Sequence, residues 1–214
     1  MNTNLKNTVL IGKLSITNWE AKKKAKSVER AAESAAGATS GTISARKALL
    51  PGAEALEDIL KHSAAMRTWW NTVSAPWFDN GMRAYNVAGH LDIVTAQRDM
   101  APHRELLINE FLDEYPALRE QARFSLNDLF DEADYPPPEV VRARFTHSFE
   151  CMPLPDTADF RVVEGVDPAE LARLQADAEA RAQARVQEAM GATVMRLTET
   201  LRTLADRLAR YSEN

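Results

Sequence analysis

The C-terminal segment 167–211 carries the pattern that most constrains the fold. Asp167 is a suitable N-cap, Pro168 fits the first helical position, and Glu170 stands where a capping-box acid belongs. Apolar residues then recur at spacings of three and four, as on one face of an α-helix. In the second half the spacing alternates strictly between four and three, at Met190, Val194, Leu197, Leu201, Leu204, Leu208 and Tyr211. This is a coiled-coil seam of about three heptads.

If continuous, this helix spans on the order of 65 Å at about 1.5 Å per residue. Gly191 is its one weak point, where the helix could kink or another helix could approach closely. Two interpretations stay open. The helix either folds back onto its own domain or mediates self-association through the six seam residues from Met190 to Leu208.

The rest of the chain also favours helices. It has only eight glycines in 214 residues, and few glycines mean few tight turns. Apolar spacing predicts helices over 20–36, 53–72, 90–114 and 116–131, with Pro102 expected to start a new turn or kink the third. The composition of segment 39–52 indicates a linker or a mobile loop.

Strands are the minority. Segment 144–152 alternates, with Phe145, His147, Phe149 and Cys151 on one face. Segments 159–165 and 8–19 are also prone to form strands, and a small antiparallel sheet is expected. The predicted fold is therefore helix-dominated α+β, with a core domain over 1–163 and a long C-terminal helix over 164–214.

Composition excludes several classes of protein. An apolar fraction of 45% and a charged fraction of 27% are typical of a globular chain, so a wholly disordered protein is excluded. Cys151 is the single cysteine, so a disulfide framework is excluded. The net charge of −5 disfavours a protein that coats duplex DNA. With no membrane-length apolar run and no signal pattern, a cytoplasmic protein that does not bind membranes is expected.

Known catalytic patterns are missing from the sequence. It contains no phosphate-binding glycine loop, no HExxH, no paired CxxC and no GxSxG. His147 and Cys151 would stand about 13 Å apart along a strand, too far for a catalytic dyad, so Cys151 is expected to be a small buried hydrophobe. We expect no catalytic residue, no metal site and no cofactor. The acidic stretch 104–139, with ten Asp and Glu residues, is read as a solvated or docking face, with a metal-dependent hydrolase as the least favoured alternative.

A basic run lies near the N-terminus. It follows Trp19 and is formed by Lys22, Lys23, Lys24 and Lys26. Lysines beside an aromatic residue are typical of proteins that bind single-stranded nucleic acid, where bases stack and phosphates pair with the cations. The same run is also typical of an exposed helix face, and this second interpretation is favoured over the first.

The most distinctive segment is 66–92, which is rich in aromatic residues. Its centre contains Pro76, Trp77, Phe78 and Arg83, and Asp79-Asn80-Gly81 has turn chemistry. The segment is interpreted either as an aromatic plug at a helix–loop–helix corner or as a loop that presents aromatic residues to a partner or to bases.

Several sequence motifs, taken together, resemble those of an uncharacterised family of phage- and prophage-encoded proteins. The resemblance rests on the PW-D-G-R pattern at 76–83, the LF and DYP pattern at 129–136, and the PLP and DFRV pattern at 153–162. It spans most of 8–163. It implies a phage or prophage origin and the host cytoplasm, and it transfers no activity.

Two functions lead from these observations. The first is a non-enzymatic, self-associating binding protein that acts on host or phage proteins, in phage DNA metabolism or in interference with a host system. The second is a protein that binds or anneals single-stranded nucleic acid through the basic run and the Trp77 loop.

Overall fold

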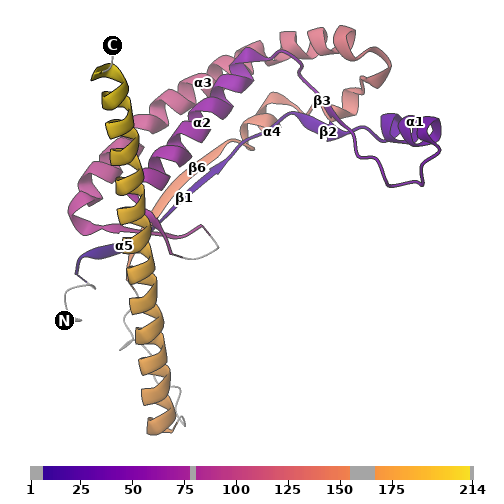
Figure 1. Ribbon diagram of the computed structural model, residues 1–214. Helices are drawn as coiled ribbons and strands as arrows, with labels where there is room; N and C mark the ends of the chain where they lie inside the picture. The colour runs from indigo at the N-terminus through magenta and orange to yellow at the C-terminus, as the bar shows by residue number, and fades with distance from the viewer. Residues whose placement is uncertain (1–6, 78–80, 155–166, 213–214) are drawn as a thin grey trace. The chain divides into compact units, whose positions relative to one another are not determined.

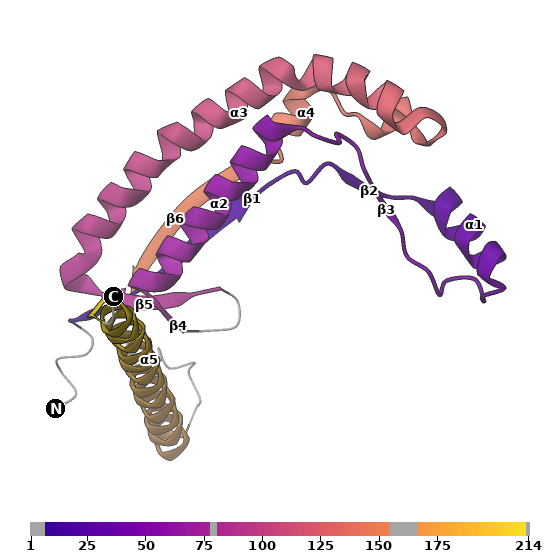
Figure 2. The same ribbon diagram turned by 45° about the horizontal axis from the view of Figure 1, so that its top comes forward.

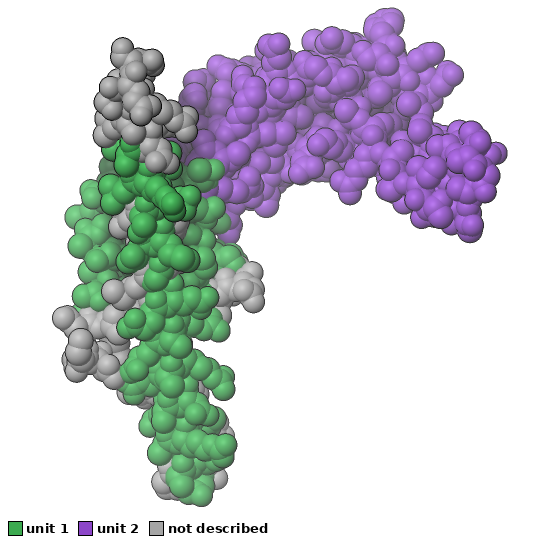
Figure 3. Space-filling view, viewed as in Figure 1, with its two compact units in different colours: residues 1–14, 68–95, 149–214 green, residues 15–67, 96–148 purple. Residues whose placement is uncertain are grey.

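A computed structural model describes residues 7–77, 81–154 and 167–212, and it confirms the helix-dominated α+β class (Figure 1). The chain divides into two compact units (Figure 3). Unit 1 comprises residues 1–14, 68–95 and 149–214, and unit 2 comprises residues 15–67 and 96–148. The division falls within β1 (Val9–Thr17), α2 (Glu54–Val73), α3 (His90–Leu126) and β6 (Thr146–Pro153), so these four elements contribute to both units.

Unit 1 contains a four-stranded antiparallel sheet in the order β4-β5-β1-β6, where β4 is Ala75–Pro76 and β5 is Arg83–Asn86. Val9 pairs with Asn86 and Gly12 with Arg83 in the antiparallel register of β1 and β5. The strands predicted over 8–19 and 144–152 are therefore confirmed, and they are neighbours in the sheet. The strand predicted over 159–165 lies outside the described residues.

Strand alternation gives the sheet two apolar faces. One carries Ile11, Trp77 and Ala84, and the other carries Tyr85, packed with Trp70 of α2 and Ile93 of α3. Gly12 is required on the second face, because a Cβ there would stand 2.9 Å from the rings of both Trp70 and Tyr85. Helix α5 (Pro168–Ser212) packs against β4, and its Arg185 donates to the carbonyl of Trp77 at 2.6 Å.

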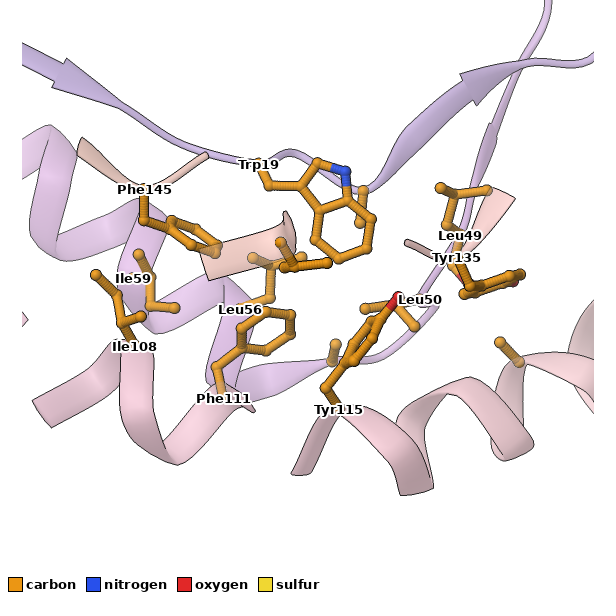
Figure 4. Close-up of a cluster of buried hydrophobic side chains, with 14 residues drawn as sticks. Trp19, Leu49, Leu50, Leu56, Ile59, Ile108, Phe111, Tyr115, Tyr135 and Phe145 are labelled. Carbon is orange, nitrogen blue, oxygen red and sulfur yellow. The ribbon is translucent and has the colours of Figure 1, made fainter. Parts of the chain in front are cut away.

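Unit 2 is built around the parts of α2 and α3 that it contains, and around α4 (Pro138–Arg142). Its core contains fourteen buried hydrophobic side chains, among them Trp19, Ile59, Phe111, Tyr115 and Phe145 (Figure 4). The rings of Trp19 and Tyr115 meet edge to face with centroids 5.7 Å apart. This geometry is favourable for aromatic pairs, so the cluster is an ordinary well-packed core.

At one end of unit 2 lie α1 (Lys26–Ala36) and a two-stranded antiparallel ribbon of β2 (Lys22–Lys24) and β3 (Arg46–Ala48) (Figures 1 and 2). Helix α1 ends at Gly37, whose φ of 63° permits the left-handed cap. The carboxylate of Glu33 accepts from the backbone of Gly41 and Ile43, and that of Glu29 accepts from Ala45. The two glutamates thus fix the connection between α1 and β3.

Three details of the predicted elements and one predicted side-chain environment were wrong. The helix predicted over 20–36 begins only at Lys26, because residues 22–24 form a strand that pairs with residues 46–48. The segment 39–52, predicted to be a linker or loop, therefore contains the strand β3. The helices predicted over 90–114 and 116–131 are one helix, α3, followed by the 3-10 turn Asn127–Leu129. Pro102 and Pro116 lie inside it at exposed positions, where the ring faces solvent and packing of the opposite face keeps the helix continuous. Cys151, predicted to be buried, is exposed.

Candidate functional site

The basic run near the N-terminus forms a ribbon rather than a helix face. In the register of β2 and β3, Lys22 lies opposite Ala48, Lys23 opposite Lys47, and Lys24 opposite Arg46. Residues directly opposite each other point to the same side of an antiparallel pair. Lys23 and Lys47 therefore share one face, and Lys22, Lys24 and Arg46 share the other. Lys26 begins α1 and is exposed.

Asp134 neutralises the first of these faces. Its carboxylate pairs with Lys23 through Oδ1 and with Lys47 through Oδ2, at 2.7 Å for the latter, and only 1% of its side chain is exposed. Burial on its own would raise the pKa of Asp134, but the hydrogen bonds and charges of the two lysines outweigh burial and lower it. The hydrogen bond to Asp134 in turn raises the pKa of Lys23. The ribbon is therefore attached to the core of unit 2 by a doubly paired buried carboxylate.

Trp19 cannot take part in base stacking in this structure. It is 6% exposed and packs against Phe111 and Tyr115, with Arg144 over its ring at 5.9 Å. The prediction that Trp19 offers a stacking surface beside the lysines is therefore wrong, because the indole is a core side chain of unit 2.

The aromatic segment in unit 1 behaves as a plug. Trp77 is 6% exposed and packs with Ile11 and Ala84, while Pro76 is exposed in β4. Phe78 lies outside the described residues. The prediction that Trp77 is presented to a partner is contradicted by its burial, and the alternative of a packing plug holds for this residue.

Arg83 has a structural role in the same segment. Its Nε donates to Ser74 Oγ at 2.7 Å, and its Nη2 donates to the carbonyls of Ser74 and Asn71 at 2.8 and 3.3 Å. These bonds hold the end of α2 against β5. The guanidinium therefore fixes the turn between helix and sheet, and its position gives no support to a role in binding.

The heptad part of α5 exposes several apolar side chains. Every residue from Gln187 to Ala205 whose exposure the structure describes is exposed. Among the seam residues, Val194 is 61% exposed, Leu201 66% and Leu204 55%. The side chains of Met190, Leu197 and Leu208 lie outside the described set. The part of α5 near Arg185 packs on the sheet, whereas Val194, Leu201 and Leu204 of the heptad part are uncovered.

A polar cluster that the sequence did not reveal lies inside unit 2. Arg104 is 1% exposed, and its Nη2 donates to the carbonyl of Thr17 and to Asn18 Oδ1 at 2.9 and 2.7 Å. Its Nε and Nη1 find no partner among the described residues. The positive charge of this guanidinium lowers the pKa of the nearby His62 and His147.

The two histidines are held neutral. Burial lowers the pKa of both, and the positive charge of Arg104 lowers both further. His147 is hydrogen-bonded to Gln97 at 3.0 Å, and the ring of His62 contacts that of His103 with centroids 4.8 Å apart. In the described part of the chain no three His, Cys, Asp or Glu side chains gather as a metal-binding group. The described side chains of this cluster therefore form polar packing inside unit 2, and their contribution to stability depends on pH.

Four carboxylates of the acidic stretch 104–139 form ion pairs. Glu132 pairs with Arg119 and Arg123, Glu120 pairs with Arg123, and Glu105 pairs with Arg142. Asp134 pairs with the two lysines of the ribbon. These contacts stabilise unit 2.

No described helix is long and apolar enough to cross a bilayer. Comparisons with protein-family models, with curated proteins and with solved structures find no match to this chain.

Proposed function

We propose that this chain is a non-enzymatic binding protein that self-associates through the heptad part of α5. The observation that carries the proposal is the exposure of Val194, Leu201 and Leu204 on one seam of a helix whose earlier part packs on its own sheet. Fully burying an aliphatic side chain of this size stabilises by about 1.5–3 kcal/mol. A seam of six such residues on each copy therefore offers a substantial gain on pairing.

A second copy fits this seam better than an unrelated partner. With Val194, Leu201 and Leu208 as a positions and Met190, Leu197 and Leu204 as d positions, both sets are apolar and self-complementary. The flanking e and g positions are Gly191, Thr193, Thr198, Thr200, Ala205 and Arg207. Because nearly all of them are uncharged, two identical helices meet with little like-charge repulsion.

The biological setting is part of the same proposal. The resemblance of residues 76–83, 129–136 and 153–162 to phage and prophage proteins supports an origin of that kind and action in the host cytoplasm. A binding protein of this type would serve phage DNA metabolism or interfere with a host system, with a host or phage protein as its target. The pairing of Glu105, Glu120, Glu132 and Asp134 with arginines and lysines favours binding over a metal-dependent hydrolase.

Substitution within the seam tests the proposal. Leu201→Glu and Leu204→Glu place a charge at exposed seam positions while keeping a good helix former. Met195→Glu is the matched control, since Met195 is 71% exposed but lies off the seam. Light scattering should show that either seam substitution lowers the mass of the assembly and that the control does not. Equal masses for all three variants would contradict self-association through this seam.

A further inference from the structure

The β2–β3 ribbon has one neutralised face and one charged face. Lys23 and Lys47 turn toward Asp134. On the other face, Lys24 has Glu29 Oε2 at 3.6 Å, although Oε1 of the same carboxylate accepts from the backbone of Ala45.

Among the residues that the structure describes, no carboxylate lies within ion-pair distance of Lys22 or Arg46. Both are exposed. We call the face formed by Lys22, Lys24 and Arg46 the outer ribbon face.

The outer ribbon face is unfavourable for the free protein. Lys24 and Arg46 are direct cross-strand neighbours, and like charges in that arrangement destabilise a strand pair. On the opposite face of the ribbon, the repulsion between Lys23 and Lys47 is offset by the buried carboxylate of Asp134. Three cations gathered on one side of a three-residue ribbon therefore indicate an external anion as the missing partner.

We propose that the outer ribbon face binds the phosphate backbone of a nucleic acid. Arg46 supplies a planar fork that matches a phosphate, and the two lysines supply point charges at alternate positions of one strand. Strand residues two apart stand about 6.6 Å from each other, so their ammonium groups can reach successive backbone phosphates. The first turn of α1 follows directly and begins with Lys26, but it also contains Glu29, so the three ribbon cations carry the contact.

This mode of binding differs from single-strand recognition by stacking. Trp19, the aromatic residue next to the lysines in sequence, is buried, so the contact is made with phosphates alone. Binding should then follow charge density, and a duplex should bind at least as tightly as a single strand of equal length. The proposal does not depend on self-association through α5, although a dimer would present two ribbons and gain avidity.

The salt dependence of nucleic-acid binding follows from the number of cations on the outer ribbon face. Three cations on a duplex give a slope of log K against log salt of about −2.7, from about −0.9 per phosphate neutralised. Removing two of the three should reduce the magnitude of the slope by about 1.8 and weaken binding about tenfold or more at low salt.

The test is fluorescence anisotropy of the full chain with a 30-bp duplex and with a dT30 oligomer, from 20 to 200 mM salt. Lys22→Ala/Arg46→Ala is compared with Lys61→Ala/Arg98→Ala, which removes the same charge from exposed positions elsewhere in unit 2. We expect the ribbon variant to lose binding to both probes and the control to bind like the parent. Circular dichroism checks that both variants are folded, and polyglutamate serves as an acidic-polypeptide probe that should bind more weakly than the duplex.

Several results would overturn the proposal. One is the absence of binding to either probe at 20 mM salt, and another is equal loss in the ribbon and control variants. Tighter binding to polyglutamate than to the duplex would point to an acidic protein instead. A fall in the mass of the parent assembly on Lys22→Ala/Arg46→Ala would identify the ribbon as a contact between copies.

Discussion

Asp134 is predicted to control the stability of the ribbon end of unit 2. The substitution Asp134→Asn removes the carboxylate that pairs with both Lys23 and Lys47 while nearly preserving the size of the side chain. Lys47 keeps only 12% of its side chain exposed, so its ammonium is left largely buried with the carbonyl of Leu129 as its remaining acceptor. The half-exposed Lys23 is screened by solvent, so its ion pair adds little to the destabilisation.

The magnitude follows from the Lys47 pair. Breaking a fully buried ion pair from one side costs about 3–5 kcal/mol. Here the retained carbonyl contact and the amide oxygen of asparagine offset part of that loss, and we expect a destabilisation of about 2 kcal/mol. In a chain of this size that corresponds to a fall in melting temperature of about 4–8 °C.

The assay is urea denaturation at pH 7, combined with amide exchange at residues that report on the ribbon. The amides of Leu49 and Ala25 donate to the carbonyls of Ala21 and Ala45, and both should exchange faster in the variant. Asp128→Asn is the control, because Asp128 is exposed in the same region. A loss within about 0.5 kcal/mol of the control would refute the reasoning.

The destabilisation caused by Asp134→Asn should also depend on pH, which provides a second test of the same ion pair. The pKa of Asp134 lies below its ordinary value in the folded chain, so its contribution is present above the unfolded pKa of about 3.9. It is lost as the pH falls through the lower folded value. The difference between the parent and Asp134→Asn should therefore be constant near neutral pH and vanish in acid.

Two further predictions concern packing and protonation. Gly12→Ala should destabilise unit 1 by about 1–3 kcal/mol in thermal or urea unfolding, because its Cβ meets the buried rings of Trp70 and Tyr85; an unchanged midpoint would contradict this packing. His62 and His147 have folded pKa values below 6.5, so stability is full above that pH and declines as the pH falls below it. His147→Gln should reduce the decline in melting temperature between pH 7.5 and 5.5; a decline as steep as the parent's would exclude His147 as its source.

Local periodicity accounts for the elements that the sequence predicted well. Segment 144–152 alternates, as a strand in a sheet with distinct faces does, and segment 8–19 is rich in residues that favour strands. Helix α2 matches the predicted 53–72 within one residue at each end, since its apolar spacing reflects one buried stripe. Patterns within one segment are enough to identify such elements.

The errors arise where a distant contact decides the outcome. Residues 22–24 are all lysine and carry no strand pattern, and they form β2 because 46–48 pairs with them and Asp134 neutralises one face. The sequence makes Trp19 a candidate for a stacking surface and leaves Trp77 open between a plug and a presented residue, because an aromatic residue beside cations or in a turn has the same local pattern whether it faces solvent or core. Burial is a property of the fold, and no local signal distinguishes the two.

The candidate surfaces show the same division. The seam of α5 was visible as a heptad pattern, whereas its exposure required knowledge of which part of the helix packs on the sheet. Arg46 was missed altogether, because it lies far from the lysine run in sequence and joins it only through the register of β2 and β3.

The most direct test of self-association is sedimentation equilibrium of the full chain from about 1 to 100 μM. The account predicts a mass at least twice the 23.8 kDa of one chain, falling toward the monomer in Leu201→Glu but not in Met195→Glu. A monomer across the whole range would contradict it.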